Sequence, residues 1–162
     1  MRGLLGALCA LLIVLVAAPA ASAVPDGDLR TYLERFEPLR LEWPADGTVT
    51  DGFGPRWGRM HNGIDVGVLR RLDVTAAAAG TVTGAGWLSG YSGYGNTVLV
   101  DVGDGYTMLY AHFDKVAVRP GQWVEVGDRL GAAGCTGWCT GTHLHFELRE
   151  AGRAVDPAPF LR

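Results

Sequence analysis

The chain has 162 residues, of which 48% are hydrophobic and 19% are charged, and its formal net charge is -3. The charge content is too low for a disordered chain, and the negative net charge excludes a nucleic-acid-binding protein. The length predicts one modest globular domain.

Residues 1–23 have the organisation of a secretory signal peptide. Arg2 precedes an apolar run over residues 4–18, and the small-residue sequence Ala21-Ser22-Ala23 follows. This pattern predicts cleavage after Ala23 and export of the rest of the chain. The alternative is an uncleaved membrane anchor, since residues 4–23 are nearly long enough to span a bilayer. If the signal is cleaved, no stable membrane insertion is expected.

Residues 24–42 are predicted to be an N-terminal arm, too short to be a domain. Leu29, Tyr32, Leu33 and Phe36 recur at helical spacing, so we expect a short amphipathic helix that ends at Pro38. A tether between a membrane and the domain is the alternative role for the same segment.

Residues 43–162 are predicted to form one all-β domain of antiparallel sheets, similar to a sandwich or a barrel. Short alternating apolar runs are separated by Gly-rich turns, and no long helical period is present. The Gly-rich stretch 84–95 is long for a hairpin turn and is predicted to be a binding loop. The expected strands are Val49–Phe53, Asp73–Ala76, Gly80–Gly86, Thr97–Val102, Tyr106–His112, Trp123–Val126 and Thr142–Leu148.

The last of these strands carries two of the four histidines. Side chains on a strand alternate between faces, so His143, His145 and Glu147 share one face. The same alternation predicts that Tyr110 and His112 project together from the strand expected over Tyr106–His112.

The histidines and one aspartate can supply a metal site. His61, Asp65 and one histidine of the His143/His145 pair form a His2Asp donor set, which suits a catalytic zinc that keeps a fourth position for water. The two remaining histidines are then free to handle protons. The H-x-x-x-D motif of His61 and Asp65 alone is a weak indication of a metal site. The other three histidines strengthen it, because they form an H-x-H pair on one strand and stand at the end of another.

Cys135 and Cys139 are an even pair in a chain that is expected to be exported. They predict a disulfide whose main effect is to stiffen a local turn, because the closed loop is short. Free thiols or intermolecular pairing are the alternatives.

Six segments, in this order and with this spacing, resemble the lysostaphin/LytM-type zinc metallopeptidases. The resemblance extends from about Trp43 to Phe160, and members of that family hydrolyse peptide bonds in bacterial peptidoglycan. The segments are Gly52-Phe53-Gly54-Pro55-Arg56, His61-Asn62-Gly63-Ile64-Asp65, Gly93-Tyr94-Gly95-Asn96-Thr97, Tyr110-Ala111-His112, Gly121-Gln122-Trp123-Val124 and Gly141-Thr142-His143-Leu144-His145-Phe146-Glu147.

The resemblance implies a role for each site residue. The zinc ligands would be His61, Asp65 and His145, with one Zn²⁺ per chain. His143 would be the base that activates the attacking water, and His112 would orient that water or stabilise the developing charge. Which of these two histidines is the principal base is left open.

Two further side chains have alternative roles. Arg56 is either a catalytic cation near the developing oxyanion or a surface arginine paired with an acidic neighbour. Glu147 is either an acceptor for a ligand imidazole or a solvated carboxylate.

Together these features predict a secreted, cell-wall-associated zinc endopeptidase that cuts peptide cross-links of peptidoglycan and acts as a monomer. The alternative is a catalytically silent domain that binds wall material or activates another hydrolase. The complete ligand set favours the enzyme, because silent relatives typically lose ligands. The chain departs from the family pattern in the segment 134–141, where Trp138 stands between the two cysteines.

Overall fold

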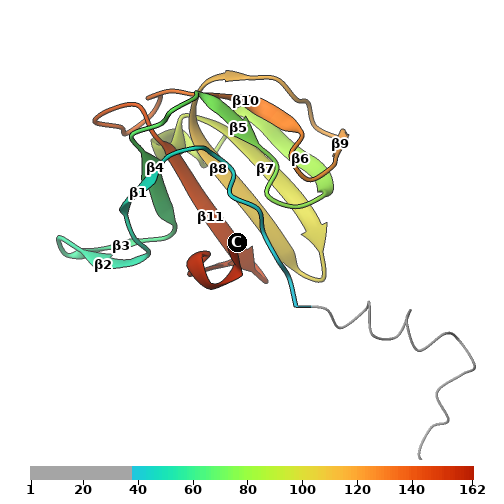
Figure 1. Ribbon diagram of the computed structural model, residues 1–162, viewed down its shortest axis with the longest axis horizontal. Coiled ribbons are helices and arrows are strands. Elements are labelled where there is room, and N and C mark those ends of the chain that lie inside the picture. Colours follow the sequence, from blue (N-terminus) through green and yellow to red (C-terminus); the bar gives the residue numbers. More distant parts are fainter. Residues whose placement is uncertain (1–37) are drawn as a thin grey trace, which may run out of the picture. The chain divides into compact units, whose positions relative to one another are not determined.

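A computed structural model describes residues 38–162, and most of their regular structure is β-strand (Figure 1). The signal peptide expected over residues 1–23 and the helix expected before Pro38 lie outside the described residues. Within residues 38–162, no helix has the length and apolar character needed to cross a membrane.

Ten strands form one antiparallel sheet, and two more form a separate hairpin. The main path of the sheet runs β1-β4-β11-β8-β7-β6-β9, while β10 pairs with β8 and β5, and β12 pairs with β11. The prediction of an all-β antiparallel fold is confirmed; the sheet is open, since β1 and β9 end its path without pairing to each other. The strands are β1 (Thr48–Asp51), β2 (Gly54–Arg56), β3 (Arg59–His61), β4 (Ile64–Gly67), β5 (Asp73–Thr75), β6 (Gly80–Trp87), β7 (Asn96–Gly103), β8 (Tyr106–Val116), β9 (Trp123–Val124), β10 (Arg129–Ala133), β11 (Leu144–Glu150) and β12 (Arg153–Val155), with 3-10 turns η1 (Ser92–Tyr94) and η2 (Ala158–Phe160).

Each of the seven predicted runs contains a strand, but the alternation of apolar residues did not indicate β2, β3, β4, β10 and β12. β10 has the sequence Arg-Leu-Gly-Ala-Ala, whose small residues have little strand propensity. Its conformation is set by pairing on both sides, with β8 and β5.

The core lies on one face of the sheet, where fully buried aliphatic and aromatic side chains pack together. Tyr110 of β8 and Phe146 of β11 are paired in register, and their ring centroids are 5.1 Å apart. The Tyr110 hydroxyl accepts a hydrogen bond from the Ala77 amide at 2.9 Å. This buried hydrogen bond satisfies a backbone donor inside the core.

The prediction that Tyr110 and His112 project from the same face is wrong. Tyr110 points into the core, whereas the ring of His112 lies 4.7 Å from that of His143, at the opposite face. The register between β7 and β8 shifts between Asn96 and Val98, and His112 has a positive φ of 65°. This bulge breaks the two-residue alternation and turns His112 towards the other histidines.

The residues just before Trp43 are part of the folded domain. Leu41 is fully buried, its amide donates to the Phe160 carbonyl at 2.8 Å, and it forms a parallel bridge with Leu161. The Glu42 amide donates to the Ala77 carbonyl at 2.8 Å. Backbone hydrogen bonds of Leu41 and Glu42 therefore join this segment to the C-terminal residues and to the segment that contains Ala77.

Candidate metal centre

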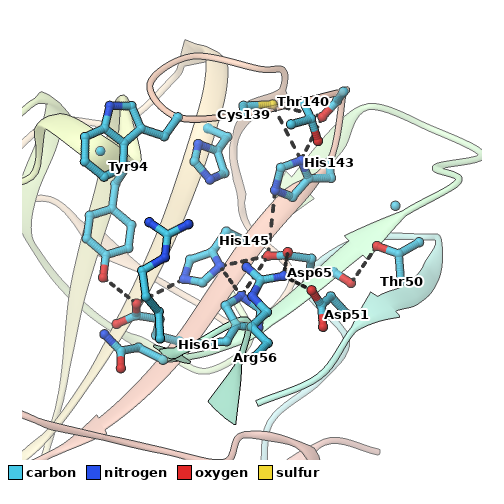
Figure 2. Close-up of a pocket in the computed structure, with 18 of the residues that line it drawn as sticks. Thr50, Asp51, Arg56, His61, Asp65, Tyr94, Cys139, Thr140, His143 and His145 are labelled. Atoms are coloured by element: carbon cyan, nitrogen blue, oxygen red, sulfur yellow. Dashed lines mark hydrogen bonds and ion pairs between the residues drawn. The ribbon is translucent and has the colours of Figure 1, made fainter. Parts of the chain in front are cut away.

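Three elements bring together one side chain each at the surface opposite the core. His61 ends β3, Asp65 lies in β4, and His145 lies in β11 directly opposite Asp65 in the strand register. His61 Nε2 is 3.1 Å from His145 Nδ1 and 3.2 Å from Asp65 Oδ1, and His145 Nδ1 is 2.8 Å from Asp65 Oδ1 (Figure 2). Three donor atoms therefore converge on one point.

The triangle of donor atoms fits a small metal ion. Ligand atoms about 2.0–2.2 Å from a tetrahedral zinc lie about 3.3–3.5 Å from each other, only slightly more than these separations. The His61, Asp65 and His145 side chains are 4%, 13% and 7% exposed, so little solvent competes for the donors. Within residues 38–162, this is the one group of three such side chains with converging donor atoms.

The other nitrogen of each ligand-type histidine is already bonded. His61 Nδ1 donates to the Gly52 carbonyl at 2.6 Å, and His145 Nε2 donates to Glu147 Oε1 at 3.0 Å. In the neutral imidazole, each bond places the proton on the bonded nitrogen, so that the lone pair of the opposite nitrogen faces the triangle. Both imidazoles are therefore oriented so that they could coordinate an ion.

Glu147 is fully buried and is held by two further partners. The Tyr94 hydroxyl donates to Oε1 at 2.7 Å, and Arg149 Nε donates to Oε2 at 2.7 Å. Burial works against ionisation of Glu147, but hydrogen bonds from His145 and Tyr94 outweigh it and lower its pKa. Glu147 is thus not a solvated carboxylate: it is buried and accepts from the His145 imidazole, the contact that its predicted role as an acceptor requires.

The charges at the triangle reinforce one another. Burial opposes ionisation of Asp65, but the hydrogen bond from His145 and the nearby imidazoles outweigh it and lower the Asp65 pKa to about 2. Burial also opposes protonation of His145, yet its hydrogen bonds to Asp65 and Glu147 raise its pKa. The carboxylates of Asp65 and Glu147 therefore stabilise a positive charge at His145 or within the triangle. A proton or a metal ion can provide that charge.

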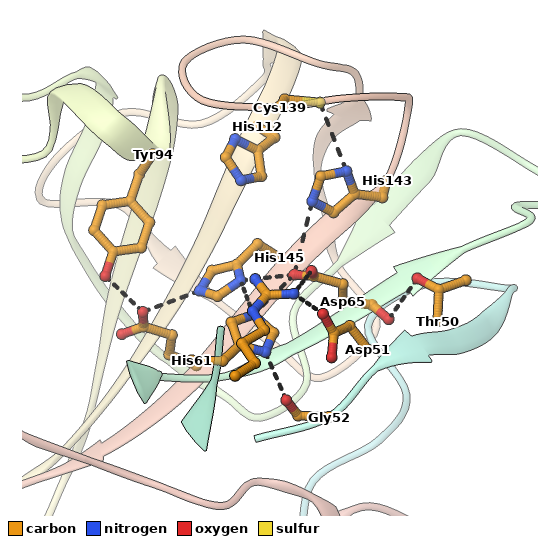
Figure 3. Close-up of polar contacts among 12 residues, drawn as sticks. Thr50, Asp51, Gly52, His61, Asp65, Tyr94, His112, Cys139, His143 and His145 are labelled. Carbon is orange, nitrogen blue, oxygen red and sulfur yellow. Dashed lines mark hydrogen bonds and ion pairs between the residues drawn. The ribbon is translucent and has the colours of Figure 1, made fainter. Parts of the chain in front are cut away.

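The two other histidines lie beside the triangle, outside it (Figure 3). His143 Nε2 is 3.7 Å from Asp65 Oδ1, and the ring of His112 is 5.9 Å from that of His145. Burial lowers the pKa of His112 to about 4, so its imidazole is neutral at ordinary pH. The pair presents imidazole nitrogens next to a triangle that could hold a metal ion, an arrangement suited to moving protons.

Arg56 contacts the triangle from the β2–β3 hairpin. Its Nη1 contacts Asp51 Oδ2 and lies 3.5 Å from Asp65 Oδ2, and the side chain is about one-third exposed. The acidic neighbour expected for a surface arginine is present. The same guanidinium also places a cation at the edge of the cluster.

These groups line an open cleft of about 980 Å³. Trp57 and Trp138, which are 85% and 80% exposed, both line it, and Trp138 lies in the Cys135–Cys139 loop. The predicted disulfide between these cysteines is confirmed, with a Cα–Cα distance of 5.2 Å.

Three residues of the site were not assigned to it from the sequence. Tyr94 and Arg149 bond Glu147, from 53 and 2 positions away in the chain, and the carbonyl of Thr136 bonds His112 from 24 positions away. Tyr94 belongs to the predicted binding loop 84–95 and to one of the six segments that resemble the family, and these were the indications available. The role of the Thr136 carbonyl cannot be predicted from the sequence, because every residue has a backbone carbonyl.

The chain was compared with known proteins. A family model described as peptidase family M23 matches residues 59–157. The chain is 40% identical over 119 residues to a lipoprotein NlpD/LppB homolog of Pseudomonas aeruginosa, covering 74% of this chain and 39% of that protein. It is 38% identical over 119 residues to the murein hydrolase activator NlpD of Salmonella dublin, covering 74% and 30%. The chain thus spans only about a third of the length of these relatives.

Among solved structures, the catalytic domain of the antimicrobial peptidase lysostaphin from Staphylococcus simulans is similar to this chain, with a TM-score of 0.63 and 34% identity. The match covers 70% of this chain and 91% of that one. The family model includes the metal triangle and both neighbouring histidines. The chain belongs to peptidase family M23.

Proposed function

We propose that this protein is a zinc-dependent endopeptidase that hydrolyses peptide cross-links of bacterial peptidoglycan outside the cytoplasm. The observation that carries the proposal is the His61–Asp65–His145 triangle, which lies in an open cleft with His112 and His143 beside it. A closed structural zinc site would not need two additional imidazoles or an open cleft.

In this proposal His61, Asp65 and His145 hold the zinc. The ion would act as a Lewis acid on the scissile carbonyl and lower the pKa of water at the site. His143 Nε2 accepts the proton of the attacking water, because it is the nearer of the two remaining imidazoles to the triangle, 3.7 Å from Asp65 Oδ1. His112, neutral because burial lowers its pKa to about 4, orients the water or the tetrahedral oxygen.

Arg56 would stabilise negative charge that develops on the substrate. Its guanidinium is about one-third exposed and lines the cleft together with its partners Asp51 and Asp65, within reach of a substrate bound there. All of these groups come from one chain, which supports action as a monomer. Export to the wall compartment is supported by the relatives named as a lipoprotein and as a murein hydrolase activator.

The second candidate function is activation of another wall hydrolase, and the name of the Salmonella relative favours it. In that case the domain would bind a protein partner, and its own cleft would not turn over substrate. The complete set of three donors and two auxiliary histidines favours catalysis, because an activator does not require them.

The experiment is digestion of purified peptidoglycan by the purified protein, followed by turbidity and by masses of the released fragments. We expect clearing that a chelator abolishes, that added zinc restores, and that His145→Ala lacks. Arg119→Ala, an exposed change in the loop after β8, is the matched control and should clear like wild type. Equal clearing by His145→Ala would falsify the proposal, and the fragment masses identify the bond that is cut.

A further inference from the structure

The segment Gly134–Gly141, hereafter the disulfide loop, holds both histidines that lie outside the metal triangle. His112 Nδ1 donates to the Thr136 carbonyl at 2.7 Å. His143 Nδ1 donates to the Gly141 carbonyl at 2.7 Å, and the His143 amide donates to the Gly134 carbonyl at 3.2 Å. Figure 3 shows His112 and His143 side by side next to the loop that carries Cys139.

These two bonds decide which nitrogen is basic. A neutral imidazole carries one proton, so an Nδ1 that donates leaves Nε2 as the free acceptor. Nε2 of His143 is the atom directed at the triangle, 3.7 Å from Asp65 Oδ1. The carbonyls of Thr136 and Gly141 therefore set the tautomer that proton transfer at the cleft requires.

The backbone of His112 is strained, so its side chain depends on the hydrogen bond to the Thr136 carbonyl. Its φ of 65° lies in the left-handed region, which is unfavourable for a residue with a Cβ and persists only where the surroundings hold it. The Thr136 carbonyl is its side-chain hydrogen-bond acceptor. A displaced loop would leave the ring of His112 free to turn.

The loop is fixed at one end by close contacts. Thr136 Oγ1 donates to the Phe113 carbonyl at 2.8 Å and accepts from the Asn96 amide at 2.9 Å, and the Trp138 amide donates to the Gly93 carbonyl at 2.8 Å. Beyond Trp138 the chain is largely exposed up to His143. Cys139 lies at this transition, and its bond to Cys135 links the exposed half of the loop to the anchored half.

We propose that the Cys135–Cys139 disulfide is a positioning element: it holds the loop carbonyls that set the tautomer and orientation of His112 and His143, and it does not contribute to metal binding. The catalytic consequence rests on the proposed function. No atom of the loop lies among the converging donors of the triangle, which come from β3, β4 and β11. Proton handling therefore depends on the disulfide, and metal binding does not.

The test is the double variant Cys135→Ser with Cys139→Ser. We expect one zinc per chain, as in wild type, and a thermal unfolding transition that remains cooperative. Nitrogen NMR of the imidazoles should show the Nδ1–H tautomer for His112 and His143 in wild type and a mixture of tautomers in the variant. With a soluble cross-linked muropeptide, kcat should fall by about 10- to 100-fold while KM changes by less than about threefold.

A second variant, Thr136→Val, keeps the disulfide and removes the hydroxyl that anchors the loop; it should shift the tautomers of His112 alone. If the double variant does not fold, mild reduction of the disulfide in the folded wild-type protein carries the test, and retention of the Nδ1–H tautomer at both histidines after reduction overturns the proposal. Retention of the Nδ1–H tautomer at both histidines in the double variant overturns the proposal, and so does loss of its zinc. The NMR result needs no turnover, so a failure of the proposed function is distinguished from a failure of this inference.

Discussion

Asp65 and His145 face each other across the antiparallel pair β4 and β11, with Asp65 Oδ1 2.8 Å from His145 Nδ1. Strand register fixes this contact, since a slip of one residue would turn one side chain to the opposite face. His61 joins them from the end of β3, where its Nδ1 is tied to the Gly52 carbonyl at 2.6 Å. The triangle is therefore preorganised by the backbone as well as by side-chain contacts.

Asp65→Asn should weaken zinc binding at least 100-fold, because the amide that replaces the carboxylate is neutral and a poorer ligand. Chelator competition with the purified protein gives the affinity. Asp104→Asn, in the β7–β8 turn and remote from the cleft, is the control and should bind zinc like wild type. Unchanged affinity in Asp65→Asn would remove Asp65 from the ligand set.

Glu147→Gln should lower zinc affinity by about 10- to 100-fold, because the carboxylate behind His145 is lost. It should also destabilise the fold by about 3 kcal/mol, since Arg149 loses its buried counter-ion. Tyr94→Phe removes one hydrogen bond to the same carboxylate and should cost only about 1 kcal/mol. Denaturant unfolding of the metal-free proteins measures the loss of stability in each variant. An equal loss in Glu147→Gln and Tyr94→Phe would contradict a stabilising ion pair between Glu147 and Arg149.

The stability of the metal-free protein should depend on the protonation of His112. Its pKa is about 4 in the folded chain and about 6.5 when unfolded, so between these values the unfolded state binds more protons. The neutral His112 therefore contributes its full stabilisation above about pH 6.5, and this contribution is lost as the pH falls to about 4. The free energy of unfolding should decrease by on the order of 2 kcal/mol over this range. Unfolding of wild type and His112→Gln at pH 4.5 and 7 checks this: the difference in stability between the proteins should shrink at the lower pH.

Tyr110→Phe should destabilise the domain by about 1–3 kcal/mol, because the Ala77 amide loses its buried acceptor. Tyr110 lies on the core face, away from the triangle, so zinc affinity should stay at the wild-type value. Calorimetry together with chelator competition separates the two effects. A change in zinc affinity would mean that the two faces of the sheet are coupled.

Much of this architecture could be predicted from alternation and motif spacing. His145 and Glu147 share a face of β11, and His61, Asp65 and His145 meet as the family resemblance implied. The alternation rule failed at His112, where a bulge against β7 reverses the face, because a local irregularity that depends on a partner strand leaves no periodic trace. β10 was missed for a related reason, since its small residues acquire strand conformation only through pairing with β8 and β5.

The supporting bonds to the site were the least predictable part. The carbonyls of Gly52, Thr136 and Gly141 orient three imidazoles, but any residue type supplies a carbonyl. The Tyr94–Glu147 bond joins residues 53 positions apart, and it depends on where the loop before β7 lies over β11. Such contacts follow from the folded backbone, and residue identity alone does not indicate them.

Catalysis is tested by incubation of a purified cross-linked muropeptide dimer with the zinc-loaded protein, followed by mass spectrometry. We predict two products whose combined mass exceeds that of the dimer by one water, with the reaction abolished by His143→Ala in a protein that still binds zinc. An intact dimer after incubation with the zinc-loaded protein, together with faster digestion of the wall by a second hydrolase in its presence, would contradict catalysis and identify an activator.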